Sequence, residues 1–363
     1  MKDKYLMDGH KMFWHLDRIV DWQNGKKIAP LHIDVGLSKG CNIKCEYCYG
    51  AIQRNSFKQG TDDYFPREAL LRYVREAGEV GVRSMAFIGE AEPLTNPHVY
   101  EAIVEGKKAG VSISMGTNGI LYDKGPAGEE ALEHLTWVRF NISAASDEAY
   151  RQIHSSKDFS VAVDKIKFCV ETKRKKNLPV TIGLQMVLTP NNISQVVALA
   201  KLGKEIGVDY LVVKQCSDTQ DNKLGFYDRL HEYKTEAFKN ELKKAEAEST
   251  DDYRVIIKWG KIENEGKLPF DVCLGVPFLL YSSGDGKIYP CGMFFDYKEE
   301  EYRMGDLVKQ SFKEILESKR YWDVVEAVKK IDVQAKCYAN CRTHSVNEFL
   351  WKLQDVPNHV DFV

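Results

Sequence analysis

The sequence has 363 residues, a formal net charge of −2 and nine cysteines. This charge provides no basic face for nucleic acid, and no apolar run approaches the ~18 residues that a membrane span needs. The N-terminal residues lack the apolar core of a signal peptide. An odd number of cysteines without such a signal indicates a cytoplasmic protein that binds metal, rather than one held together by disulfides.

Residues 1–30 form a short lead-in, and we expect its aromatic side chains Phe13, Trp14 and Trp22 to pack against the main domain. After it, strand and helix patterns alternate, which indicates βαβ units and a parallel sheet. The expected strands cover residues 31–35, 83–88, 111–116, 137–142, 180–188 and 210–215. The expected helices cover residues 66–77, 97–109, 127–135, 147–154, 161–175 and 193–206.

Six such units are too few for a closed eight-stranded barrel, but they fit an open, partial (β/α)6 barrel of the TIM type. Right-handed crossovers bring the loops that follow the strands to one rim, where barrels of this kind hold their chemistry. A charged amphipathic helix over residues 226–248 precedes a polar stretch. We therefore expect a lead-in (1–30), a partial barrel (31–248) and a small C-terminal domain (249–363).

Three cysteines follow the first expected strand with the spacing C-x3-C-x2-C: Cys41, Cys45 and Cys48. Three thiolates on one short loop can converge on three corners of a metal cluster, whereas a disulfide would leave one cysteine over. A cubane iron–sulfur cluster needs four ligands, so one corner stays open for an exogenous ligand. One alternative is a zinc site, although the second matching cysteine pair that is common in zinc sites does not follow here. The other is that these are buried structural cysteines.

With Tyr47 as the aromatic residue, these cysteines form a C-x3-C-x-aromatic-C motif that resembles the signature of radical S-adenosylmethionine (SAM) enzymes. The resemblance implies a [4Fe–4S] cluster whose unique iron is chelated by SAM. It also implies reduction by a flavodoxin- or ferredoxin-type donor, cleavage of SAM and formation of a 5′-deoxyadenosyl radical that abstracts a hydrogen atom. In such an enzyme the cofactor carries the chemistry and the protein supplies orientation and seclusion.

The second expected strand ends in Gly89-Glu90-Ala91-Glu92-Pro93, which resembles the Gly-Gly-Glu-Pro motif of this family. There, small residues allow close approach of the backbone and an acidic group meets the SAM ammonium. Glu90 and Ala91 stand where the family prefers glycine, while Glu92 and Pro93 are retained. We expect Gly89, Glu90 and Glu92 to contact SAM; an ordinary turn is the alternative.

Polar side chains at or after the later strands are further candidates for SAM binding. These are Thr117, Asn118, Ser143, Arg151 and Gln185. Hydroxyl and amide groups can bind the ribose or carboxylate of SAM, and Arg151 can pair with the carboxylate. The alternatives to SAM binding are that Ser146 is a helix N-cap and that Arg151 is a solvated helix residue.

A second set of cysteines lies near the C-terminus: Cys273, Cys291, Cys337 and Cys341. This set resembles the auxiliary-cluster region of radical SAM enzymes with a SPASM or Twitch extension. Because the full SPASM pattern has seven cysteines, the resemblance is closer to the Twitch type with one auxiliary [4Fe–4S] cluster. Four thiolates would close that cluster, and a structural zinc site with four cysteine ligands is the alternative.

Cys169 lies among apolar residues of an expected helix, whereas Cys216 directly follows the sixth expected strand. We expect Cys216 to face the active rim, where its thiol could return a hydrogen atom to a substrate radical; a small loop residue without chemistry is the alternative. Lys214, Asp218 and Asp221 are other rim candidates for proton transfer or substrate contacts.

Only 40 residues precede Cys41, which is short for the leader-binding domain of many peptide-modifying relatives. We therefore expect a small-molecule substrate, such as a sugar, a cyclitol or a nucleotide-linked carbohydrate, that is oxidised or epimerised. One alternative is a maturase that modifies a peptide or protein side chain. Another is a non-enzymatic binding protein stabilised by zinc or clusters.

Overall fold

The computed structural model describes residues 4–48, 50, 63–264, 266–337 and 341–362. Ten strands form one sheet in the order β10-β9-β8-β1-β2-β3-β4-β5-β6-β7. The strands are β1 His32–Val35, β2 Ser84–Phe87, β3 Ser112–Thr117, β4 Trp137–Asn141, β5 Thr181–Leu188, β6 Tyr210–Gln215, β7 Arg254–Ile257, β8 Leu279–Ser282, β9 Lys287–Tyr289 and β10 Gly305–Asp306.

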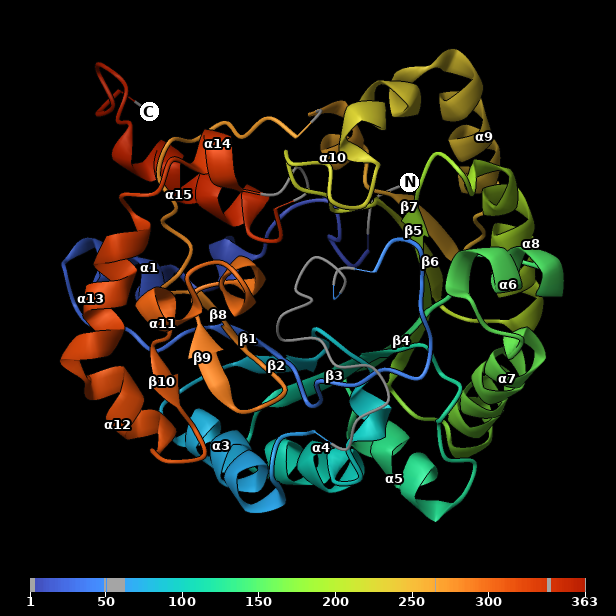
Figure 1. Cartoon of the computed structure of the whole chain (residues 1–363), viewed down its shortest axis with the longest axis horizontal. Helices are drawn as coiled ribbons and strands as arrows, with labels where there is room; N and C mark the ends of the chain where they lie inside the picture. The colour runs from blue at the N-terminus through green and yellow to red at the C-terminus, as the bar shows by residue number, and fades with distance from the viewer. Residues whose placement is uncertain (1–3, 49, 51–62, 265, 338–340, 363) are drawn as a thin grey trace.

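Neighbouring strands from β1 to β7 pair in parallel, and β8 pairs in parallel with the free side of β1. Only β9 and β10 are antiparallel to their neighbours. The strands curve around the centre of the molecule, and the helices that connect them lie outside (Figure 1). The sheet does not close, so the predicted partial barrel is confirmed.

The helices of the described ranges fall into α-helices and short 3₁₀ helices. The α-helices are α1 Leu16–Gln23, α3 Arg67–Glu79, α4 Val99–Lys108, α5 Pro126–His134, α6 Asp147–His154, α7 Phe159–Lys176, α8 Val196–Ile206, α9 Glu236–Glu246, α10 Trp259–Glu263, α11 Glu299–Tyr302, α12 Phe312–Glu317, α13 Lys319–Val328, α14 Val333–Lys336 and α15 His344–Gln354. The 3₁₀ helices are η1 Met12–Trp14, η2 Pro93–Thr95, η3 Ile193–Gln195, η4 Tyr227–Lys234 and η5 Gly292–Phe295. None of these helices has the length and apolar composition that a membrane crossing requires.

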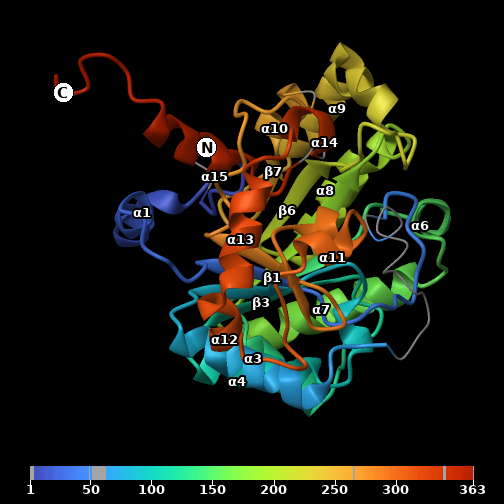
Figure 2. The ribbon, with the colours of Figure 1, turned by 60° about the vertical axis from the view of Figure 1, so that its left-hand side comes forward.

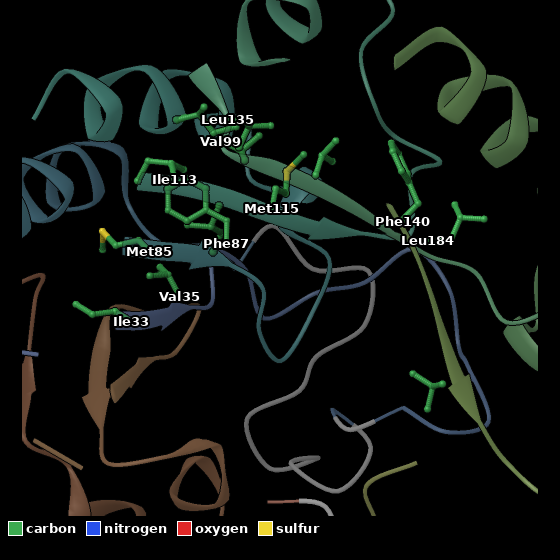
Figure 3. Close-up of a cluster of buried hydrophobic side chains, with 14 of the residues drawn as sticks. Ile33, Val35, Met85, Phe87, Val99, Ile113, Met115, Leu135, Phe140 and Leu184 are labelled. Atoms are coloured by element: carbon green, nitrogen blue, oxygen red, sulfur yellow. The ribbon is translucent and has the colours of Figure 1, made fainter. Parts of the chain in front are cut away.

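Alternation along the strands separates a hydrophobic outer layer from a polar interior. In β1, Ile33 and Val35 are fully buried against the helices, and Asp34 between them faces the centre of the barrel. The same outer layer continues in β2 and β3, where Phe87 and Met115 lie beside them (Figure 3). Because successive side chains of a strand point to opposite faces, a packed outer layer leaves the alternate positions free to line a cavity.

Strands that come after residue 248 belong to the same sheet as those that come before it. The strand β7 extends the sheet beyond β6, and β8 extends it beyond β1. The boundary expected near residue 248 thus falls between two neighbouring strands, and the division of the chain into domains stays a prediction.

Two expectations about local structure were wrong. The helix expected over residues 226–248 is interrupted, because the side chain of Thr235 accepts a hydrogen bond from Phe238 N and begins α9 as its N-cap. In the lead-in, Phe13 and Trp14 are 58% and 70% exposed, and the ring of Phe13 contacts Phe349 of α15, at 5.0 Å between centroids, rather than the barrel. Trp22 does pack inward, with its ring 5.5 Å from that of Phe278. The chain after α15 extends away from the body of the molecule (Figure 2).

Candidate active site

A cavity of about 860 Å³ occupies the centre of the barrel. Both cysteine sets line it: Cys41, Cys45, Cys48, Cys273, Cys291, Cys337 and Cys341. The first set comes from the loop after β1, and the second comes from the segments around β8, β9 and α14. Segments far apart in the sequence therefore bring seven thiols to one enclosed space.

All nine cysteines are free thiols. Burial raises the pKa of Cys41 to about 12 and that of Cys273 to about 11, and neighbouring thiols add to the shift in both sets. Across the described ranges, no three His, Cys, Asp or Glu side chains converge on one point as the ligands of a single metal ion do. A buried thiol with a raised pKa stays protonated until a metal displaces the proton. The chemistry of both donor sets fits iron–sulfur clusters, whose ligands lie on several irons.

His154, at the C-terminal end of α6, is fully buried beside Cys45. Its Nδ1 lies 3.1 Å from Cys45 Sγ, and its Nε2 accepts a hydrogen bond of 2.9 Å from Ser143 N. Burial lowers the pKa of His154 to about 3, so the ring is neutral. Since the backbone N–H of Ser143 can only donate, the ring proton is assigned to Nδ1, where it faces the sulfur.

Tyr47 also lies beside His154 and is linked to the sheet by hydrogen bonds through Ser143. The Ser143 hydroxyl donates to the Tyr47 hydroxyl at 2.8 Å and accepts from Val187 N at 3.1 Å. Glu46 is held by the loop after β5, because its carboxylate accepts from Thr189 Oγ1 at 3.0 Å. The cysteine loop is therefore fixed to α6 and β5 by side chains between its second and third cysteines.

The carboxylate of Glu92 is buried and held by three donors. It accepts hydrogen bonds from Thr117 Oγ1 at 2.5 Å, from Asn118 N at 2.8 Å and from Leu94 N at 3.1 Å. Asn118 Nδ2 in turn donates to Asn42 Oδ1 of the cysteine loop at 2.7 Å. Burial outweighs these donors and raises the pKa of Glu92 to about 7. The loops after β1, β2 and β3 are thus joined around one carboxylate.

Both carboxylate oxygens of Glu90 have partners within the chain. It forms a buried ion pair of 2.9 Å with Lys39 and accepts from Gly284 N at 2.9 Å. Gly89 lies against Gly36, and a Cβ on Gly89 would come within 2.6 Å of the Gly36 Cα. The loops after β1, β2 and β8 can approach this closely only because these positions lack side chains.

The second cysteine set is organised by Asn347 of α15, which is fully buried. Its Oδ1 accepts from Leu274 N at 2.7 Å and from Gly275 N at 2.8 Å, while its Nδ2 lies 3.6 Å from Cys273 Sγ. Such hydrogen bonds to ligand groups orient them and tune a bound cluster. The sequence analysis missed both Asn347 and His154, because neither lies in a motif and each is brought to its cysteine by tertiary structure.

Most of the predicted cofactor residues line the cavity, and two do not. Those that line it are Tyr47, Gly89, Glu90, Glu92, Thr117, Asn118 and Gln185. Ser143 lies behind the cysteine loop, and Arg151 is exposed on the outer side of α6. Cys216 is only 2% exposed and is not among the residues that line the cavity, although Glu46 and Cys48 of the cysteine loop are among its electrostatic neighbours. The structure therefore does not bring Arg151 or Cys216 to the cavity, and Ser146 is an N-cap that accepts from Ala149 N.

Comparison with known proteins identifies relatives over most of the chain. The AdoMet-dependent heme synthase of Methanosarcina barkeri is 25% identical over 331 residues, which cover 85% of this chain and 88% of that protein. The cysteine-type anaerobic sulfatase-maturating enzyme of Clostridium perfringens is 24% identical over 338 residues, covering 84% and 86%. The fold resembles that of Streptococcus suis SuiB bound to its precursor peptide SuiA, with a TM-score of 0.60, 15% identity and coverage of 90% and 75%.

These relatives correct the expected substrate. The expectation of an enzyme that oxidises or epimerises a sugar, a cyclitol or a nucleotide-linked carbohydrate is wrong, because the relatives that match most of the chain are a heme synthase and a sulfatase-maturating enzyme. The small number of residues before Cys41 was a poor guide to the substrate.

The family comparison agrees with the cysteine pattern. Residues 35–203 match the radical SAM superfamily, and residues 279–343 match the SPASM iron–sulfur cluster-binding domain. The first match contains Cys41, Cys45 and Cys48, and the second contains Cys291, Cys337 and Cys341. The chain is a radical SAM enzyme with a C-terminal SPASM-type domain, and its cofactors are SAM, the [4Fe–4S] cluster that binds SAM, and an auxiliary [4Fe–4S] cluster.

Proposed function

We propose that this enzyme modifies an amino-acid side chain of a peptide or protein. The observation that carries the proposal is the similarity to the sulfatase-maturating enzyme, which extends over 84% of this chain and 86% of that enzyme. The cavity of about 860 Å³ also has the size of a site that takes a cofactor and part of a substrate together. Oxidation or crosslinking of a side chain is the reaction class that we infer.

We assign the first cysteine set, Cys41, Cys45 and Cys48, to the cluster that binds SAM. The second set, Cys273, Cys291, Cys337 and Cys341, is assigned to one auxiliary cluster. When bound, the reduced SAM cluster and SAM supply a 5′-deoxyadenosyl radical that abstracts a hydrogen atom from the substrate, with the electron delivered by a flavodoxin- or ferredoxin-type donor. Both sets line one cavity, so a cluster held by the second set would face the substrate and could accept an electron from it.

The chain itself would bind and orient SAM through the loops after β2, β3 and β5. Glu92 offers a buried carboxylate to the SAM ammonium, and its three donors hold it in place. Gln185 lines the cavity and donates to Asn141 Oδ1 at 3.1 Å, which leaves its own carbonyl oxygen to accept from a ribose hydroxyl. Glu90, with both oxygens bound inside the chain, anchors the loops.

The test is a search for modified peptides. The anaerobically reconstituted enzyme is incubated with SAM, dithionite and a synthetic peptide library that carries Cys, Ser, Thr, Tyr or Lys at the centre. We expect SAM-dependent loss of two hydrogens from one peptide class, with 5′-deoxyadenosine formed in equal amount. The variant C41A/C45A/C48A is the control and should modify none. SAM cleavage that responds to a non-peptide substrate, while every peptide stays unchanged, would contradict the proposal.

A further inference from the structure

Five cationic side chains line the cavity on the side of β4, β6, β7 and α10. They are Arg139, Lys214, Lys258, Lys261 and Arg342. Arg139 and Lys214 are inward-facing positions of β4 and β6, Lys258 directly follows β7, Lys261 belongs to α10, and Arg342 follows Cys341. The side chain of Arg342 lines the cavity and is 53% accessible.

Two of these cations have partners near the second cysteine set. Lys261 Nζ donates to the carbonyl oxygen of Cys341 at 3.0 Å. Arg342 Nε donates to Asp34 Oδ2 at 3.2 Å. These two side chains are therefore held by the segment that carries Cys341 and by Asp34.

The other carboxylates of the cavity are also engaged. Glu90 pairs with Lys39, Glu92 is held by its three donors, and Asp8 accepts from Gly260 N at 3.1 Å. Within the part of the chain that the structure describes, the side-chain ammonium groups of Lys214 and Lys258 form no ion pair and no hydrogen bond. Among the described residues, the ammonium groups of Lys214 and Lys258 therefore have no carboxylate partner on this side of the cavity.

The remaining cation, Arg139, is held by aromatic groups. Its guanidinium lies 4.9 Å from the ring centroid of Trp137 and is hydrogen-bonded to the hydroxyl of Tyr210. Gly183 makes room for Tyr210, because a Cβ there would meet the tyrosine ring at 2.1 Å. This packing fixes the guanidinium beside the cavity, and its planar fork suits a carboxylate.

These cations line one cavity closely enough to affect each other's pKa. Burial and then the positive charges of Arg139, Lys261 and Arg342 lower the pKa of Lys214 to about 7. Burial, Lys261, Arg342 and Arg139 likewise lower the pKa of Lys258. Cationic groups gathered in a poorly solvated space destabilise each other unless an anion lies between them. The arrangement has the charge and the room to bind one.

We propose that Arg139, Lys214 and Lys258 bind carboxylate groups of the substrate. The proposal rests on the proposed function in taking the substrate to be a peptide, and it specifies that acidic side chains flank the residue that is modified. Arg139 of β4, Lys214 of β6 and Lys258 after β7 line the same cavity as the first cysteine set, so an acidic segment bound to them would place an adjacent side chain in that cavity.

The test uses the anaerobically reconstituted full-length enzyme and a fluorescein-labelled hexaglutamate peptide, with a hexaglutamine peptide that carries the same label for comparison. Fluorescence anisotropy should show binding of hexaglutamate, weaker at high salt, and weaker binding of hexaglutamine. The variant K214Q/K258Q should bind hexaglutamate about tenfold or more weakly. The matched control is K167Q/K243Q, which makes the same change of charge at exposed positions of α7 and α9 and should bind as the wild type does.

A second measurement needs no variant. Hexaglutamate should protect Lys214 and Lys258 of the wild-type enzyme from acetylation by acetic anhydride, while Lys167 and Lys243 react as before. Mass spectrometry of the digested protein measures the modified fraction at each site. Equal binding of the two peptides, equal affinity of K214Q/K258Q and wild type, or unprotected lysines would each overturn the proposal.

These outcomes separate this inference from the proposed function. If the library yields modified peptides that are neutral around the target residue, the carboxylate site is wrong and the maturase function stands. If hexaglutamate binds and protects the lysines but no peptide is ever modified, the site stands and the proposed function fails.

Discussion

The Nδ1 atom of His154 lies 3.1 Å from the sulfur of Cys45, although 109 residues separate the two in the sequence. The ring is neutral, and its Nε2 accepts from Ser143 N, so the Nδ1 proton faces the thiol. A hydrogen bond to a ligating sulfur favours the more negative, reduced state of an iron–sulfur cluster. His154 is therefore a positioning residue that we expect to raise the reduction potential of the cluster bound by Cys45.

Replacing His154 by Phe removes this donor. A net hydrogen bond of about 1 kcal/mol corresponds to roughly 40 mV for a one-electron couple, so the midpoint potential of the SAM-binding cluster in H154F should fall by that amount. Redox titration followed by electron paramagnetic resonance measures it. H154Q, whose amide can donate to the sulfur and accept from Ser143 N, should restore much of the potential. Equal potentials in wild type and H154F would show that the contact has no electronic role.

Glu92 should make stability depend on pH. Its pKa is raised by burial from 4.5 to about 7 in the folded state, so its contribution to stability is present below pH 4.5 and is lost as the pH rises through 7. Gln does not titrate. The free energy of unfolding of the wild type should therefore fall by about 3 kcal/mol relative to that of E92Q as the pH rises from below 4.5 to above 7. Urea denaturation of both apo proteins across this range measures the difference. A difference that is constant with pH would refute the raised pKa.

Asn347 should be required for the second cysteine set. Replacement by Leu, which has a similar size, leaves Leu274 N and Gly275 N without an acceptor. Each such loss costs about 1–3 kcal/mol, and the loop that carries Cys273 should loosen. N347L should therefore melt at lower temperature and lose iron from the auxiliary site, whereas N347D, which keeps the acceptor, should retain more. The exposed replacement N240L is the control, and full iron content in N347L would contradict this role.

Gly89 should tolerate no side chain. In G89A the new Cβ would lie 2.6 Å from the Gly36 Cα, so the loops after β1 and β2 must move apart. Overpacking of this kind typically costs about 1–3 kcal/mol, and the displaced cysteine loop should weaken SAM binding as well. G9A is a suitable control, because its Cβ would meet only ordinary contacts of 3.6 Å. Unchanged stability and SAM affinity in G89A would show that the loops are not packed as described.

Local sequence patterns predicted most of the helices and strands of the barrel well. Alternation in β1 and the 3.6-residue period of helices such as α3 and α4 depend only on neighbouring residues, and these elements lie within a few residues of the expected ranges. The motif of Cys41, Cys45 and Cys48 likewise resembles the signature of the radical SAM superfamily, which the family comparison identifies. The continuous helix expected over residues 226–248 failed because the local cap at Thr235 overrides the amphipathic pattern.

What the sequence did not predict depends on distant segments. The pairing of β8 with β1 joins residues almost 250 positions apart, and no local period records it. His154 and Asn347 are ordinary helix residues until the fold brings each to a cysteine. The substrate was predicted from the length of chain ahead of Cys41, which says nothing about the cavity. Arg139, Lys214 and Lys258 describe the cavity better, and they meet only in the folded protein.

The most direct test of the account is cluster content and SAM cleavage in the variant C41A/C45A/C48A. The wild type, reconstituted anaerobically and reduced, should contain about eight irons in two [4Fe–4S] clusters and form 5′-deoxyadenosine from SAM. The variant should keep about four irons at the second cysteine set and form none. Full iron content in the variant, or continued formation of 5′-deoxyadenosine, would show that these three thiols do not hold the cluster that cleaves SAM.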